Sequence, residues 1–294
     1  YQSGKGISKR SISMKKTIKE LRVELQEIKK HRREAYWAHG FLVHDPSIYL
    51  TRLLIATPIK ANQVTMIMLA LGITGSLLLL SPIMFIKILG FFLIYMNFLF
   101  DSSDGEVARY RKEYSIRGVY LDDMNHLITP PLFIICLGVG LLPFTELSTT
   151  LIFFTAVLGG LSWSVMKSRG KESFYLLIRH YAKNPENYSN ILSSTSSGSH
   201  ILGESIVSKE SFIRKILSVR FQLRQFLFAY LLFTIAFIVD ILLLENYATM
   251  SWLLMFYGVF LTLHLIEEFV KGYLQIEREV GHLANSYKIT KKES

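Results

Sequence analysis

The sequence predicts an all-α integral membrane protein with six transmembrane helices and an N-terminal amphipathic juxtamembrane helix. Half of its 294 residues are hydrophobic, and its basic residues lie between long apolar stretches. Six of these stretches reach the length of about 20 residues that a helix needs to cross a bilayer. A nucleic-acid-binding protein would instead gather its basic residues on a polar domain, so we expect no nucleic-acid partner.

The region before the first span, residues 1–61, is expected to contain the amphipathic helix. Apolar residues recur there at intervals of three and four, and Lys and Arg fill the opposite face. The apolar positions are Met14, Ile18, Leu21, Leu25 and Ile28. Such a helix can lie on an anionic membrane surface or pack under the bundle. A coiled coil is the alternative, although two heptads are short for one.

The six predicted spans form a transmembrane domain over residues 62–270. They lie at about 63–82, 85–106, 119–143, 149–167, 223–244 and 250–270. Short polar breaks separate the two members of each pair, as hairpins of helices require. A long connection, about 168–222, joins the fourth span to the fifth, and residues 271–294 form a C-terminal tail.

The distribution of basic residues predicts the orientation in the membrane. Of the 33 Lys and Arg, all except Lys87 lie on the side that holds both termini. Because basic loops remain in the cytoplasm, we expect both termini, and the end of the second span, on the cytoplasmic side. The chain starts at Tyr1 rather than at Met, so we expect a trimmed start or residues upstream.

Acidic residues close the second span and reappear in the third, across a predicted loop of nine residues, 109–117. At about 100° per residue, Asp101 and Asp104 share one helix face, and Asp122 and His126 share a stripe on the next helix. Asp123 points away from Asp122 and is expected to be a neighbour rather than a ligand. Three carboxylates near lipid are costly unless a hard cation offsets their charge. The pattern therefore predicts a site for Mg²⁺ or Mn²⁺ on the cytoplasmic side.

Small and basic residues lie between these acids. Gly105 and Ala108 remove side-chain bulk where a ligand approaches the backbone, and Arg109 offers a planar fork of donors to a phosphate. With a cation that also binds phosphate oxygens, they predict a diphosphate site. The alternative is that the acids pair with nearby basic residues at an ordinary membrane interface, although acids inside a membrane are usually functional.

The ordered pattern resembles the signature of the CDP-alcohol phosphotransferase (CDP-alcohol phosphatidyltransferase) family of integral membrane enzymes. The resemblance is carried by Asp101-x2-Asp104-Gly105-x2-Ala108-Arg109-x8-Gly118-x3-Asp122. Residues 61–65, Ala-Asn-Gln-Val-Thr, are similar to the Pro-Asn-x-x-Thr stretch that opens the family's core. The signature ends with a fourth aspartate, and this sequence has His126 at that position.

The resemblance implies transfer of a substituted phosphate from a CDP-linked donor, such as CDP-diacylglycerol, to an alcohol in phospholipid or related phosphodiester synthesis. CMP is the other product, and the enzyme is implied to be a homodimer. The implied metal ligands are Asp101, Asp104 and Asp122, with His126 as a further candidate. The implied donor-binding residues are Asn62, Thr65, Asp101, Gly105, Ala108, Arg109 and Gly118.

His126 stands where the family has its proposed catalytic base, beside the catalytic candidate Asp122. Three interpretations stay open: a general base, a metal ligand through nitrogen, or a sign that the site binds donor and has lost activity. A prenyl-diphosphate transferase or a transporter with an acidic ion site are further alternatives for the whole chain.

Polar and basic residues near the fourth and fifth spans are candidates for acceptor binding. They are Ser164, Lys167, Arg169, Arg220 and Arg224. Family members that use phosphorylated alcohols are similar in placing basic residues there. The alternative is that these side chains are cytoplasmic anchors that reach toward lipid headgroups.

Overall fold

The described part of the chain is built from helices alone, which confirms the predicted all-α fold. The computed structural model describes residues 17–26, 40–169, 175, 176, 179, 223, 225–244 and 247–286. Within these residues, six helices are long and apolar enough to cross a membrane. This composition is typical of a multi-pass integral membrane protein, because a helix satisfies its own backbone hydrogen bonds in lipid.

The six spanning helices lie close to the predicted spans. They are α6 (Ala61–Leu78), α7 (Met84–Arg111), α8 (Ile116–Leu141), α9 (Thr149–Arg169), α13 (Phe226–Val239) and α14 (Ala248–Ser286). A π-helical turn, η3 (Asp240–Leu244), extends α13. The last helix, α14, continues past the predicted end of the sixth span into the predicted tail.

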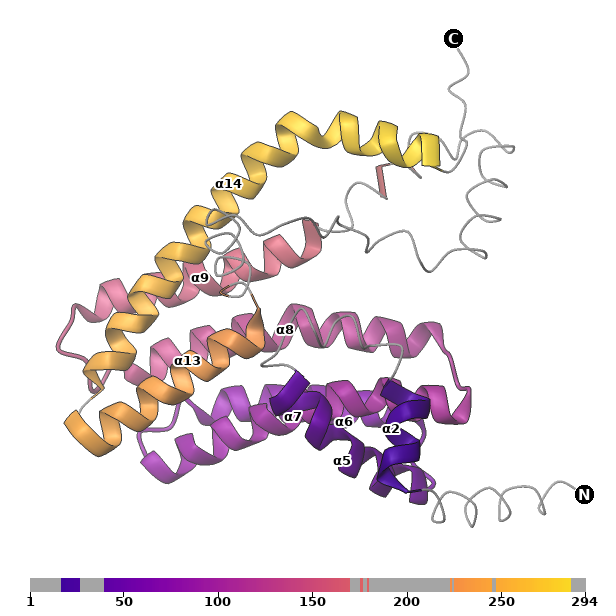
Figure 1. Cartoon of the computed structure of the whole chain (residues 1–294). Helices are drawn as coiled ribbons and strands as arrows, with labels where there is room; N and C mark the ends of the chain where they lie inside the picture. Colours follow the sequence, from indigo (N-terminus) through magenta and orange to yellow (C-terminus); the bar gives the residue numbers. More distant parts are fainter. Residues whose placement is uncertain are drawn as a thin grey trace, which may run out of the picture.

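The spanning helices lie alongside one another (Figure 1), and buried residues of α7, α8, α9, α13 and α14 form one apolar cluster. α6 packs against α7 and α8, α8 against α9, and α9 against α14. Aromatic side chains of α7, α8 and α13 fill the core, among them Phe91, Phe133, Tyr230 and Phe233. The Tyr230 hydroxyl donates to the Phe91 carbonyl at 3.0 Å, which satisfies a polar group inside this apolar region.

A buried amide ladder fixes the register of α6, α7 and α8. Asn97 Nδ2 donates to the Met68 carbonyl and to Asn125 Oδ1, each at 2.8 Å. The Thr129 hydroxyl donates to the same Asn125 oxygen at 2.8 Å. Hydrogen bonds between small polar side chains hold membrane helices together. Because Asn97 lies one helical turn before Asp101, the ladder also aligns the acidic ends of α7 and α8.

Lys87, the one basic residue predicted on the outer side, is buried rather than exposed to that side. Its ammonium donates to the carbonyls of Leu79 and Gly140, at 3.3 and 2.7 Å, near the ends of α6 and α8. It also lies 5.4 Å from the ring centroids of Phe144 and Tyr247. Lys87 therefore satisfies helix-end carbonyls at the end of the bundle opposite the acidic residues.

Two short helices precede the spans. α2 (Ile18–Gln26) lies within the predicted amphipathic stretch. A π-helical turn, η2 (Gly40–His44), leads directly into α5 (Asp45–Ala56). The sequence analysis did not predict α5, which packs against α7.

The described part of the amphipathic stretch packs on protein. Leu21 and Leu25 are fully buried in a cluster shared with α5, α6 and α7. Met14 and Ile28 lie outside the described residues. That one amphipathic helix joins all these positions stays a prediction.

Candidate active site

The two acid-bearing helices meet at a turn much shorter than the predicted loop of nine residues. Only residues 112–115 lie between α7 and α8. Lys112 adopts a left-handed conformation, with φ of 57°, and thereby ends α7. Ser115 caps α8, because its hydroxyl accepts a hydrogen bond from the Gly118 N–H at 2.9 Å. The two helices therefore leave the turn in fixed relative positions.

Three of the predicted site residues converge beside this turn. His126 Nε2 lies 3.6 Å from Asp101 Oδ1 and 3.5 Å from Asp122 Oδ1. One ligand atom from each residue lies within 4.8 Å of the others. All three side chains are only partly buried, so a ligand can reach them from solvent.

This donor set fits a divalent metal ion. Two carboxylate oxygens from different helices can bind a hard cation, and an imidazole nitrogen can complete the set. Without a cation, the carboxylates of Asp101 and Asp122 would repel each other at the membrane interface. The three residues therefore form a candidate metal centre between α7 and α8.

Asp104 lies near this centre and is held by a different residue. Its Oδ2 accepts a hydrogen bond from the Thr65 hydroxyl at 2.9 Å. Thr65 is buried on α6, so three helices contribute to the site. Asp104 is not among the three residues whose ligand atoms converge, and its direct metal contact stays a prediction.

Arg109 lies against the small residues of α7. A Cβ atom at Gly105 would come 3.3 Å from Arg109 Nη1, so the missing side chain leaves room for the guanidinium. Arg109 Nε donates to the Leu25 carbonyl of α2 at 2.9 Å. Within the described part of the chain, its Nη2 is buried with no hydrogen-bond partner. Ala108 packs with the apolar cluster of α2, α5 and α6. The orphaned Nη2 donor is suited to a phosphate oxygen.

Gly118 permits a close approach between α6 and α8. A Cβ atom at this position would come 2.8 Å from Asn62 Oδ1. That oxygen accepts a hydrogen bond from the Ser115 hydroxyl at 2.7 Å. Two predicted donor-binding residues, Asn62 and Gly118, are therefore in contact with each other, and whether they also bind donor stays a prediction.

Gly118→Ala is expected to destabilise the protein by about 1–3 kcal/mol, because the added methyl group displaces the Asn62 side chain and disturbs its hydrogen bond with Ser115. The matched control is Gly105→Ala, where the added carbon meets the flexible end of Arg109 instead. Both changes replace glycine by alanine within a helix, so the difference between the two variants reports mainly what the added carbon meets. Thermal unfolding in one detergent measures it, and equal midpoints for the two variants would contradict the assigned contact.

Ser164, a candidate for acceptor binding, has a structural partner. Its hydroxyl donates to the Leu127 carbonyl of α8 at 3.4 Å. Pro131 stands four residues after Leu127 and has no N–H, so the usual helical donor to that carbonyl is missing. Ser164 thus replaces a lost backbone hydrogen bond, and an additional contact with acceptor stays a prediction.

The other acceptor candidates are placed only in part. Lys167 is exposed near the end of α9. Arg169 ends the same helix, and its side chain lies outside the described part. Arg220 and Arg224 lie outside the described residues altogether. Their predicted role therefore stays a prediction.

The comparisons with known proteins agree with the sequence pattern. The sequence model of the CDP-alcohol phosphatidyltransferase family matches residues 59–174, which contain α6 to α9 and the whole candidate metal centre. The comparison with curated proteins found no match. The family consists of transferases that act on a CDP-alcohol donor and an alcohol acceptor in membranes, so the match supports a CDP-alcohol phosphotransferase role in general. Residues 59–174 of this chain are thus similar to the CDP-alcohol phosphatidyltransferase domain.

Proposed function

We propose that this protein transfers a substituted phosphate from a CDP-linked donor to an alcohol. The alcohol oxygen forms a bond to the β-phosphorus, the bond from that phosphorus to the oxygen of CMP breaks, and CMP leaves. The observation that carries the proposal is the convergence of Asp101, Asp122 and His126 inside the family match. The expected donor is CDP-diacylglycerol or another CDP-alcohol, in phospholipid or related phosphodiester synthesis.

The carboxylates are proposed to hold Mg²⁺ or Mn²⁺. When bound, such an ion would offset the negative charge of the diphosphate and of the departing CMP. Asp101 and Asp122 face the space where the ion would bind. Asp104 is a proposed further ligand, and the Thr65 hydroxyl would keep its carboxylate oriented.

His126 is proposed as the general base, and in that role its Nε2 does not bind the metal ion. The proton of the attacking hydroxyl would pass to Nε2, which faces the two carboxylates. Asp101 and Asp122 would then stabilise the imidazolium that forms, since each lies within 4 Å of it. A histidine therefore replaces the fourth aspartate of the family signature with a group that can accept the same proton.

The donor is proposed to contact Arg109 through Nη2, the buried donor atom that has no partner in the described part of the chain. Asn62, Thr65, Gly105 and Gly118 surround the same end of α6, α7 and α8. The charge asymmetry of the connections supports a cytoplasmic site. A homodimer is the proposed assembly.

Purified protein, incubated with labelled CDP-diacylglycerol and a panel of alcohols and alcohol phosphates, is expected to release CMP only with a divalent cation. EDTA should stop the release, and added Mg²⁺ or Mn²⁺ should restore it. Metal-dependent donor binding without CMP release would instead support the non-catalytic alternative. Activity on a prenyl diphosphate, with none on any CDP-alcohol, would reject the proposal.

A further inference from the structure

Glu106 is a fully buried carboxylate within the acidic end of α7. At about 100° per residue, it points about 140° away from Asp101 and thus away from the candidate metal centre. It occupies a variable position of the signature, where the sequence analysis assigned no role. A buried carboxylate is costly unless hydrogen bonds satisfy it.

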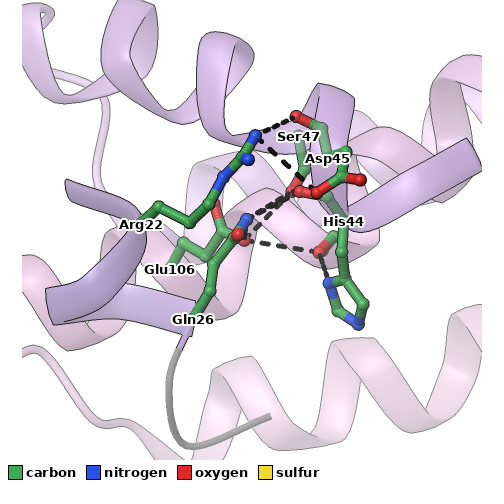
Figure 2. Close-up of polar contacts among 7 residues, drawn as sticks. Arg22, Gln26, His44, Asp45, Ser47 and Glu106 are labelled. Carbon is green, nitrogen blue, oxygen red and sulfur yellow. Dashed lines mark hydrogen bonds and ion pairs between the residues drawn. The ribbon is translucent and has the colours of Figure 1, made fainter. Parts of the chain in front are cut away.

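Three donors to Glu106 come from the two helices that precede the spans, and the Ser102 hydroxyl of α7 itself also donates to Oε1, at 3.5 Å. Gln26 Nε2 of α2 donates to Oε1 at 2.8 Å. From α5, the Ser47 hydroxyl donates to Oε1 at 3.0 Å and the Thr51 hydroxyl donates to Oε2 at 2.6 Å. Figure 2 shows Gln26 and Ser47 directed toward Glu106 from different elements. Both carboxylate oxygens are therefore occupied by donors that lie outside the family match.

Two arginines of α7 also bind α2 and α5, and with Glu106 they attach the end of α7 to these two helices. Arg109 Nε donates to the Leu25 carbonyl of α2. Arg111 Nη2 donates to the carbonyls of Leu54 and Thr57 at the end of α5, at 3.2 and 2.8 Å. α2 and α5 thus hold the last turns of α7 on the side away from the metal centre. Arg109 links this attachment directly to the proposed donor site.

We propose that Glu106 is a positioning residue that holds the metal-binding and donor-binding face of α7 in place through α2 and α5. Gln26, Ser47 and Thr51 donate to both carboxylate oxygens of Glu106, so this one side chain joins α7 to α2 and to α5. The inference rests on the proposed function, and it makes the N-terminal helices part of the catalytic unit.

Glu106→Gln in the full-length protein keeps the shape of the side chain and replaces one acceptor oxygen with an NH₂ group. We expect Mn²⁺ binding, measured by the electron paramagnetic resonance signal of the free ion, to weaken about tenfold. The Mn²⁺ concentration for half-maximal CMP release should rise in parallel. The double variant Gln26→Glu with Glu106→Gln exchanges amide and carboxylate across the α2–α7 contact and should recover most of the loss.

Asp240→Asn is the matched control for the loss of a buried carboxylate. Asp240 is also fully buried, and it accepts hydrogen bonds from the backbone N–H groups of Thr249 and Met250 at 2.9 and 2.8 Å. It lies at the opposite end of the bundle, near Lys87 and Tyr247. This variant should lower the unfolding midpoint and leave Mn²⁺ affinity unchanged.

The outcomes separate this inference from the proposed function. If wild type binds Mn²⁺ and releases CMP while Glu106→Gln matches it in both, the positioning role is rejected and the proposed function stands. If wild type does neither, the proposed function fails and the inference falls with it. If Glu106→Gln does not fold, Thr51→Val removes one donor, and unchanged Mn²⁺ affinity in that variant would overturn the inference.

Discussion

Asp122→Asn is expected to reduce CMP release by about 100-fold or more, because it removes a negative charge from the candidate metal centre. Asp122 Oδ1 lies 3.5 Å from His126 Nε2 and converges with the carboxylate of Asp101. Asparagine preserves the shape and leaves one neutral oxygen. The same variant should bind Mn²⁺ more weakly, which can be measured without any substrate.

Asp123→Asn is the control for this prediction. It makes the same chemical change one residue away, at a carboxylate outside the group of three converging ligand atoms. We expect its CMP release to stay within about twofold of wild type, as for a change that leaves the reacting groups in place. Equal losses in the two variants would show that the total negative charge of α8 matters rather than the Asp122 ligand, and would reject the proposed centre.

His126→Ala is expected to abolish turnover and to spare metal-dependent donor binding. The physical reason is that alanine cannot accept the proton of the attacking hydroxyl, while Asp101 and Asp122 remain to bind the cation. General base catalysis contributes about 10²–10⁴-fold, which sets the size of the loss. His126→Asp should retain part of the activity, since a carboxylate can also accept the proton. Single-turnover CMP release and equilibrium donor binding, measured on the same preparation, separate the two effects.

His264→Ala provides the comparison for His126. His264 is a buried histidine of α14 that also contacts two carboxylates, Glu267 at 3.4 Å and Glu268 at 3.8 Å. Activity per folded molecule should be close to that of wild type in this variant. Loss of Mn²⁺ binding in His126→Ala would instead identify His126 as a ligand, and normal turnover would remove it from the mechanism.

Much of the fold could be predicted because each spanning helix carries its own signal. A run of about 20 apolar residues indicates a span whatever surrounds it. α5 escaped prediction because its 12 residues are too few to span and it is held by α7, which follows it in the chain. Asp45 and Pro46 at its start, followed by apolar residues at helical spacing, are the signal that could have found it.

The part of the candidate site that depends on helical periodicity could be predicted from the sequence. Asp122 and His126 share a stripe because they are four residues apart, and the structure places that stripe opposite Asp101. The contacts of Glu106 and Arg109 depend on α2, about 80 residues earlier in the chain, and no local pattern reports such a contact. Thr65 could be predicted only in part. The resemblance implied a donor-binding role for it, but its hydrogen bond to Asp104 was not predicted.

The short turn at Lys112 also limits how this part of the chain can change in length during evolution. Residues 112–115 join two helices whose facing residues must meet, so an added or deleted residue there would have to be absorbed by this short turn. The same change inside α7 or α8 would rotate the residues beyond it by about 100° on the helix surface, and Asp122 and His126 would then face away from Asp101. The turn holds none of the proposed metal ligands, yet its length helps to set how α7 and α8 face each other. The eight-residue interval between Arg109 and Gly118 is therefore constrained by the geometry of the turn, although the turn takes no part in the chemistry.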